Sequence, residues 1–184
     1  GNNNASEQIQ FNVDDTAPSV TFLSPVSGSI FTVNSGSQIF NSSVNDNLPV
    51  AMVLFMFDNS SGIGFNATAV FDNASNVWSA QYNVSALMEG EHIVTVFTED
   101  SAGNVNNSVS LSFTVDSTPP LVTILSPSSG SIFTSTSSNQ TFNASVTDSL
   151  LPIDKVVFMF DNASSLDFNV TAVFDNSSNT WTAQ

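Results

Sequence analysis

The sequence contains no cysteine and no arginine, and Lys155 is its single basic residue apart from His92. Without cysteine, this chain of 184 residues has neither disulfide bonds nor thiolate metal ligands, so its stability has to come from packing. A net charge of −15 with almost no basic residues excludes nucleic acid as a reasonable partner, because phosphate binding requires lysine and arginine. Only 9% of the residues are charged, so Ser, Thr and Asn, or groups attached to them, have to keep the surface soluble.

Long apolar runs and helical periodicity are also missing. No run approaches the roughly 20 apolar residues that a membrane-spanning helix needs, so we expect no transmembrane segment in this window, and no signal peptide is visible. Between turn signals, the apolar residues instead alternate with a period of two and are rich in Val, Phe, Ile and Thr. This pattern predicts short β-strands throughout the chain.

The chain repeats itself. Residues 53–81 reappear almost letter for letter as residues 156–184, and the match continues upstream with an offset of 102 residues. We therefore predict three parts: residues 1–15 as the last strand of a preceding repeat, 16–116 as a complete repeat, and 117–184 as an incomplete repeat that reaches the start of its fifth strand. A start within a repeat predicts that the chain is an internal window of a longer array.

Seven strands are expected in the complete repeat, at residues 19–23, 38–44, 51–57, 65–71, 77–84, 92–98 and 108–115. Seven antiparallel strands in about 100 residues favour an all-β, immunoglobulin-like Greek-key sandwich, with a barrel as the alternative. Alternation assigns ten side chains to the core, with Trp78 as an anchor beside them. The ten are Phe40, Val44, Val53, Phe55, Phe57, Val94, Val96, Val109, Leu111 and Phe113.

Residues 87–104, LMEGEHIVTVFTEDSAGN, precede a strand rich in Ser and Thr and then VDSTPP. Together with SP..GSIF near the start of each repeat, this segment resembles the immunoglobulin-like repeats found in tandem on bacterial and archaeal surface proteins. The resemblance covers essentially the whole chain and implies an extracellular stalk, adhesin, surface layer or filament. The chain departs from the usual pattern in its abundance of Phe and Met, and in His92, where Tyr is more common.

Twelve Asn residues stand in N-x-S/T sequons, whereas chance placement of the Asn, Ser and Thr residues would give about six. They are Asn4, Asn41, Asn59, Asn66, Asn73, Asn83, Asn106, Asn139, Asn143, Asn162, Asn169 and Asn176. The alternative is that Asn and Ser are simply turn residues of a β protein. We predict N-linked glycans, foremost on Asn41, Asn66 and their copies Asn143 and Asn169, and hence an exported glycoprotein.

Five acidic residues gather at one pole of the predicted sandwich, namely Asp14, Asp15, Asp46, Glu99 and Asp100. Oxygen ligands without nitrogen or sulfur suit Ca²⁺, so calcium is the candidate cofactor. The arrangement resembles the inter-repeat calcium sites of cadherin-like modules, although none of their motifs is present. The alternative is that these side chains only close turns.

Catalysis is not expected. His92 lies on the inward parity of its strand, where a packed, hydrogen-bonded role is expected and a general base is not. Lys155 corresponds to Met52 in the other copy, so no chemistry shared by the repeats depends on it. The adjacent Asp14 and Asp15 form a poor pair for glycoside hydrolysis.

The outward face of two neighbouring strands is unusually apolar. A solvated sheet face is normally polar, and a contiguous apolar stripe usually marks an interface. We therefore predict lateral packing against another copy of the chain, with a glycan or loop covering the stripe as the alternative. The predicted interface consists of Met52, Leu54, Met56, Ile93 and Phe97, with Val157 and Met159 in the second copy.

Two functions follow from these features. The first is a structural segment of an extracellular tandem array, and the second is an adhesin-type module that recognises a cell-surface or glycan partner. Near-identity of the two copies favours the structural role, because a specific binding site needs loops that differ from the scaffold. The strands missing from the second repeat are expected from the continuing chain, with donation by the residue 7–13 segment of a neighbour as the alternative.

Overall fold

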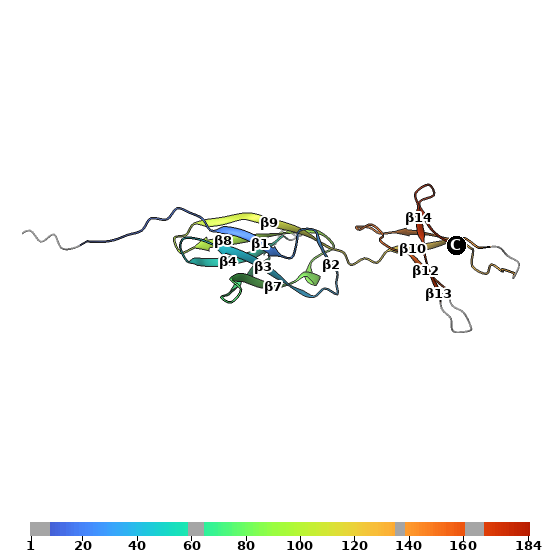
Figure 1. The fold of residues 1–184 in the computed structure, drawn as a ribbon, viewed down its shortest axis with the longest axis horizontal. Helices are drawn as coiled ribbons and strands as arrows, with labels where there is room; N and C mark the ends of the chain where they lie inside the picture. The colour runs from blue at the N-terminus through green and yellow to red at the C-terminus, as the bar shows by residue number, and fades with distance from the viewer. Residues whose placement is uncertain (1–7, 59–64, 135–138, 161–167) are drawn as a thin grey trace, which may run out of the picture. The chain divides into compact units, whose positions relative to one another are not determined.

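The computed structural model describes residues 8–58, 65–134, 139–160 and 168–184. The chain divides into two compact units, Gly1–Ser117 and Thr118–Gln184 (Figure 1). Within the described residues the structure consists of strands and a single turn of 3-10 helix, and no helix in them is long and apolar enough to cross a membrane.

The first unit is a two-layer sandwich. One sheet has the strand order β1-β3-β7-β6, and the other has the order β2-β9-β8-β4-β5. The pairs are antiparallel except for β2 and β9, which run parallel. The predicted immunoglobulin-like β-sandwich is therefore confirmed. Its elements are β1 (Ser19–Ser24), β2 (Ser29–Phe31), β3 (Ser37–Asn45), β4 (Val50–Phe57), β5 (Phe65–Thr68), β6 (Val70–Asp72), β7 (Val77–Asn83), η1 (Val84–Ala86), β8 (Gly90–Asp100) and β9 (Val105–Val115).

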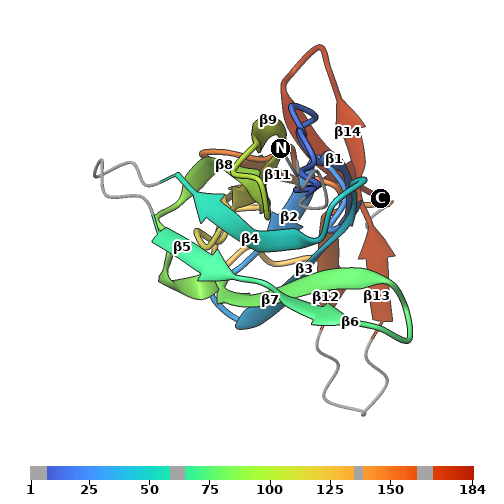
Figure 2. The ribbon, with the colours of Figure 1, turned by 90° about the vertical axis from the view of Figure 1, so that its left-hand side faces the viewer.

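The fourth predicted strand, residues 65–71, is wrong as a single element. The chain pairs with β4 as β5, passes Ala69, and then pairs with β7 in the other sheet as β6 (Figure 2). Ala69 is buried, and its N–H donates to the carbonyl oxygen of Val53 at 2.9 Å. The strand β2 was not predicted, because three residues are too few for an alternating pattern to be visible.

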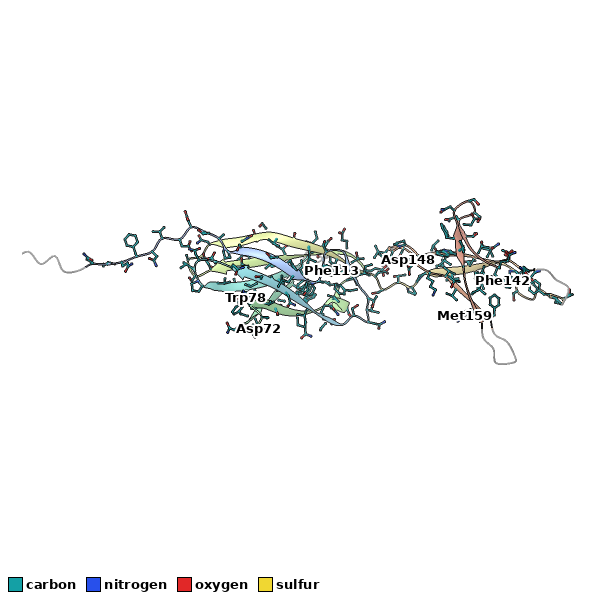
Figure 3. All side chains as sticks on the ribbon, in the orientation of Figure 1. Asp72, Trp78, Phe113, Phe142, Asp148 and Met159 are labelled. Carbon is teal, nitrogen blue, oxygen red and sulfur yellow. The ribbon has the colours of Figure 1, made fainter. Side chains whose placement is uncertain are left out.

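Aromatic rings form the centre of the core. Phe40, Phe55, Phe57 and Phe113 are at most 2% exposed. The ring centroid of Phe40 lies within 6.1 Å of the ring centroid of each of the other three. Trp78, labelled in Figure 3, is only partly buried at the margin of the core. Its ring packs against that of Phe71. The predicted inward residues are buried, apart from the half-buried Val109.

The second unit repeats the first part of this sandwich. Its strands are β10 (Leu121–Ser126), β11 (Phe142–Thr147), β12 (Val157–Phe160), β13 (Phe168–Thr171), β14 (Val173–Asp175) and β15 (Thr180–Ala183). They form a sheet in the order β10-β11-β15-β14 and a separate hairpin of β12 and β13. Phe158 and Phe160 contact Phe142 but stay half-buried, whereas their counterparts Phe55 and Phe57 are fully buried between two sheets.

The segment that precedes β1 has the sequence of a final strand but forms no strand over residues 8–18. Ile9, Phe11 and Val13 are 80 to 91% exposed, although the residues that match them in β9 lie in the core. That residues 1–15 end a preceding repeat stays a prediction.

Candidate functional site

Three carboxylates meet at one pole of the first sandwich. Asp14 precedes β1, Asp46 directly follows β3, and Asp100 ends β8, and one ligand oxygen from each lies within 4.8 Å of the others. These three residues are called the acidic pole below. The other two residues predicted for this site are not members, because Asp15 is exposed in the neighbouring position and Glu99 lies half-buried on the outward side of β8.

Asp100 is the best supported member of the acidic pole. It is 1% exposed, and its Oδ1 accepts hydrogen bonds from the backbone N–H groups of Ala102 and Asn104 at 2.8 and 2.9 Å. Its Oδ2 accepts from Nδ2 of Asn104 at 2.9 Å. Burial raises the pKa of Asp100, but these hydrogen bonds and one from Gly103 outweigh it and hold the pKa below its usual value. Asp100 is therefore ionised at neutral pH.

Asp14 and Asp46 each use only one carboxylate oxygen. Oδ1 of Asp14 accepts from the Thr16 N–H at 3.2 Å and from Nδ2 of Asn47 at 3.0 Å, and Oδ1 of Asp46 accepts from the Leu48 N–H at 2.8 Å. Both Oδ2 atoms are buried, and neither accepts a hydrogen bond from the described part of the chain. Because a buried carboxylate oxygen normally has a partner, the acidic pole offers two unused oxygens to a cation, and an all-oxygen donor set suits Ca²⁺.

Asn104 was not among the predicted site residues. Its Nδ2 donates both to Oδ2 of Asp100 and to the Asp14 carbonyl oxygen at 3.2 Å, so it ties the loop after β8 to the segment before β1. The sequence Asp100-Ser-Ala-Gly-Asn104 indicates a tight turn, and Gly103 there has a φ of 91°. That turn is the signal that could have identified Asn104.

The predicted glycan acceptors fall into three groups. Asn66, Asn73, Asn83, Asn139, Asn169 and Asn176 are exposed, whereas Asn41, Asn106 and Asn143 are half-buried. Asn4, Asn59 and Asn162 lie outside the described residues.

The half-buried acceptors are held by the protein. Nδ2 of Asn41 donates to Oγ of Ser24 at 3.0 Å, and Nδ2 of Asn106 donates to the Pro18 carbonyl oxygen at 2.8 Å. The Oδ1 atoms of Asn41 and Asn143 are buried. Because the glycan would be attached at Nδ2, the exposed acceptors are the accessible ones.

The predicted lateral face occupies the outward side of β4 and β8. Leu54 lies directly opposite Phe97, with Met52 and Met56 on either side of Leu54 along β4. These four side chains are half-buried, whereas Ile93 on β8 is 48% exposed. In the second unit, Val157 and Met159 are 36% and 79% exposed on β12. The five residues of the first unit are called the apolar stripe below.

His92 has the packed role that its parity predicts. It is 3% exposed, its Nε2 lies 2.7 Å from the Met88 carbonyl oxygen, and its ring stacks on Phe113. Its Nδ1 lies 3.4 Å from Oδ1 of Asp58, which also accepts the Ile93 N–H at 2.7 Å. The imidazole therefore belongs to the packing of β8.

The two halves of the chain match known families. Residues 33–117 match the family model described as Bacterial Ig-like domain, and residues 120–184 match the one described as Bacterial Ig domain. Among curated proteins, the chain is 33% identical over 129 residues to Halomucin from Haloquadratum walsbyi, covering 67% of this chain and 1% of that protein. The chain thus spans a very small part of the curated relative that it matches.

Solved structures include similar arrangements. The fibronectin(III)-like modules of Clostridium thermocellum CbhA are 20% identical with a TM-score of 0.42, and the match covers 84% of this chain and 80% of theirs. The SrpA adhesin from Streptococcus sanguinis is 15% identical with a TM-score of 0.42, covering 57% of this chain and 60% of its own.

Proposed function

Because the chain belongs to the bacterial immunoglobulin-like domains and carries them in tandem, we propose that it is a structural segment of an extracellular tandem-repeat protein. It serves at the cell surface in a filament, stalk or surface layer, and its copies associate laterally through the apolar stripe. Its role is mechanical and involves no catalysis.

The observation that carries this proposal is the identical strand register of the two units. Leu54 pairs with Thr68 and Met56 with Asn66, and one repeat later Val157 pairs with Thr171 and Met159 with Asn169. The register of β6 with β7 also recurs in β14 with β15, because the pair Phe71 and Trp78 of the first unit corresponds to the pair Phe174 and Trp181 of the second. A chain that rebuilds one scaffold in successive repeats is suited to a spacer.

Calcium at the acidic pole would stiffen such a spacer. Asp14 belongs to the segment that enters the first sandwich, whereas Asp46 and Asp100 belong to the sandwich itself. An ion that takes an oxygen from each would tie the entering segment to the domain and limit its swivelling.

Lateral association is supported by the chemistry of the apolar stripe. The outward faces of the adjacent strands β4 and β8 carry large apolar side chains. The same face of the next strand, β9, instead carries Ser110, Ser112 and Thr114. Burying the stripe against a second copy removes apolar area from water, at about 25 cal/mol per Å². Met side chains suit a contact between repeats that are similar but not identical.

Substitution of the stripe tests the lateral contact. Leu54→Asp with Phe97→Asp places two charges at the centre of the stripe, so we expect the chain to stay folded and to become monomeric in sedimentation equilibrium. The matched control is Thr21→Asp with Ser110→Asp, which adds the same charge at outward positions away from that centre. Equal self-association of both double variants would contradict the proposal.

An adhesin-type module is the second candidate, and binding assays on the whole chain separate the two. A structural segment is expected to show no specific signal on a glycan array or on cells. Saturable binding to one glycan class, unaffected by the stripe variants, would favour the adhesin.

A further inference from the structure

A sequon lies beside the apolar stripe. In the antiparallel pair of β4 and β5, Asn66 is directly opposite Met56, and Thr68 is directly opposite Leu54. Residues paired in this way have Cβ atoms about 4.5 to 5.5 Å apart on the same face of the sheet. Both functional residues of the sequon Asn66-Ala67-Thr68 therefore project on the outward side, next to the stripe.

The second unit places the same groups together. Asn169 is directly opposite Met159 and Thr171 is opposite Val157, and both Asn169 and Met159 are exposed. Met159 is labelled in Figure 3. The pairing of a sequon with a methionine thus occurs in both copies, although Lys155 stands where the first copy has Met52.

The apolar stripe is one surface that a glycan on Asn66 would cover, and the exposed edge of β5 is a second. β5 is the last strand of its sheet, so among the described residues no strand lies beside one row of its backbone N–H and C=O groups. An open edge invites pairing with another chain, and proteins usually protect such edges. A bulky, hydrated group attached to β5 would protect the edge and the adjoining part of the stripe together.

We infer that an N-linked glycan on Asn66 covers Met56 and Leu54 and thereby controls lateral association, with Asn169 acting in the same way on Met159 and Val157. This inference rests on the proposed lateral contact. Where the glycan is present, sugar covers the β4 side of the stripe and the packing of a second copy there is weakened. Where it is absent, the whole stripe and the β5 edge are open.

The attachment is a glycosyl transfer from an activated oligosaccharide whose leaving group is a diphosphate. Nδ2 of Asn66 forms a bond to the anomeric carbon of the sugar, and the bond between that carbon and the diphosphate oxygen breaks. The oxygen keeps the electron pair, and the amide nitrogen loses one proton. The glycosylating host supplies the donor, and the protein supplies an exposed acceptor.

The experiment compares the whole chain from a host that glycosylates N-x-S/T sequons with the chain from one that does not. Glycopeptide mass spectrometry measures occupancy, and peptide mapping after dilute peroxide measures oxidation of Met56 and Met159. Met88, which is 61% exposed on the loop before β8, is the internal reference. Sedimentation equilibrium measures the self-association constant.

The variants Asn66→Gln and Asn169→Gln, made together, remove both acceptors. Asn73→Gln removes a sequon at the turn between β6 and β7, in the other sheet, and is the matched control. Thr68→Ala removes the same sequon without changing Asn66, and Thr68→Ser keeps it. These two Thr68 variants separate loss of the glycan from a folding defect that replacing Asn66 itself would cause.

We expect Asn66 and Asn169 to be occupied, and the glycans to slow oxidation of Met56 and Met159 severalfold relative to Met88. They should also weaken self-association at least about tenfold, or 1.4 kcal/mol. The variant lacking both Asn66 and Asn169 should lose these effects at both sites, and Thr68→Ala should lose them at Asn66 and Met56 while keeping protection of Met159. Asn73→Gln and Thr68→Ser should keep all of them. Bare Asn66 in a host that modifies Asn73, or oxidation rates that the glycan leaves unchanged, would overturn the inference.

The two proposals fail in different ways. If the unglycosylated chain stays monomeric, the lateral contact is refuted, and with it the control of association. Protection of Met56 from oxidation still reports whether the glycan on Asn66 covers the stripe.

Discussion

Calcium binding at the acidic pole yields a quantitative prediction. An ion that binds the folded first unit stabilises it by about 2.7 kcal/mol at a free concentration one hundred times the Kd. The unit comprises Gly1–Ser117, and for a domain of that size 1 kcal/mol corresponds to roughly 4 °C in Tm. Saturating Ca²⁺ should therefore raise its Tm by on the order of 10 °C, and a chelator should reverse the change.

Asp46→Asn tests the origin of that shift. The amide oxygen can still accept the Leu48 N–H, so the turn is preserved, while one of three neighbouring negative charges is removed and the orphaned Oδ2 is replaced by a donor. Without calcium, the variant should melt higher than the natural chain, because repulsion within the acidic pole is reduced. With calcium, it should gain much less than the natural chain does.

Glu99→Gln is the matched control, since it removes one charge from a residue adjacent to Asp100 but outside the acidic pole. Scanning calorimetry with and without Ca²⁺ measures all three chains. A natural chain whose Tm is the same in calcium and in chelator would refute the site, and so would equal calcium shifts in Asp46→Asn and Glu99→Gln.

Two further predictions concern stability. Phe55→Ala, at a side chain that is 0% exposed, should lower the free energy of unfolding by about 3 to 5 kcal/mol. Phe65→Ala, at a side chain that is 46% exposed, should cost far less, and urea denaturation that shows equal losses would contradict this account of the core. The Ser75 hydroxyl and the Ala74 N–H hold the pKa of Asp72 below its usual value, so its contribution to stability is complete above the unfolded pKa of 3.8 and is lost as the pH falls through the lower folded pKa. Unfolding measured between pH 6 and about pH 2 should show this loss in the natural chain and less of it in Asp72→Asn, and identical pH profiles would contradict it.

Much of the fold could be predicted from alternation along single strands. Val53, Phe55 and Phe57 alternate with Met52, Leu54 and Met56, and this pattern alone separates the core side of β4 from its outward side. The repeat of the same letters one domain later predicted that the second unit would use the same strands. Local patterns suffice here because successive side chains of an extended chain point to opposite faces.

The passage of the chain from one sheet to the other, between β5 and β6, could not be predicted from alternation. Residues 65–72 are an uninterrupted strand-like run, and the small apolar Ala69 marks no boundary in it. What divides the run is the hydrogen bond from Ala69 to Val53, a residue 16 positions earlier, together with the different partners of β5 and β6. Such a division is set by pairing between distant segments.

The acidic pole and the glycan acceptors show the same limit. The sequence determined which residue types are present, but Asp14 and Asp100 enter the cluster while their neighbours Asp15 and Glu99 do not, because adjacent residues point in different directions. Asn41 and Asn66 both have outward parity, yet Asn41 lies on β3 between β1 and β7, where Ser24 engages its amide, whereas Asn66 lies on an edge strand and is exposed. Only the tertiary structure decided between them, because the place of a strand within its sheet is a property of its neighbours and not of its own residues.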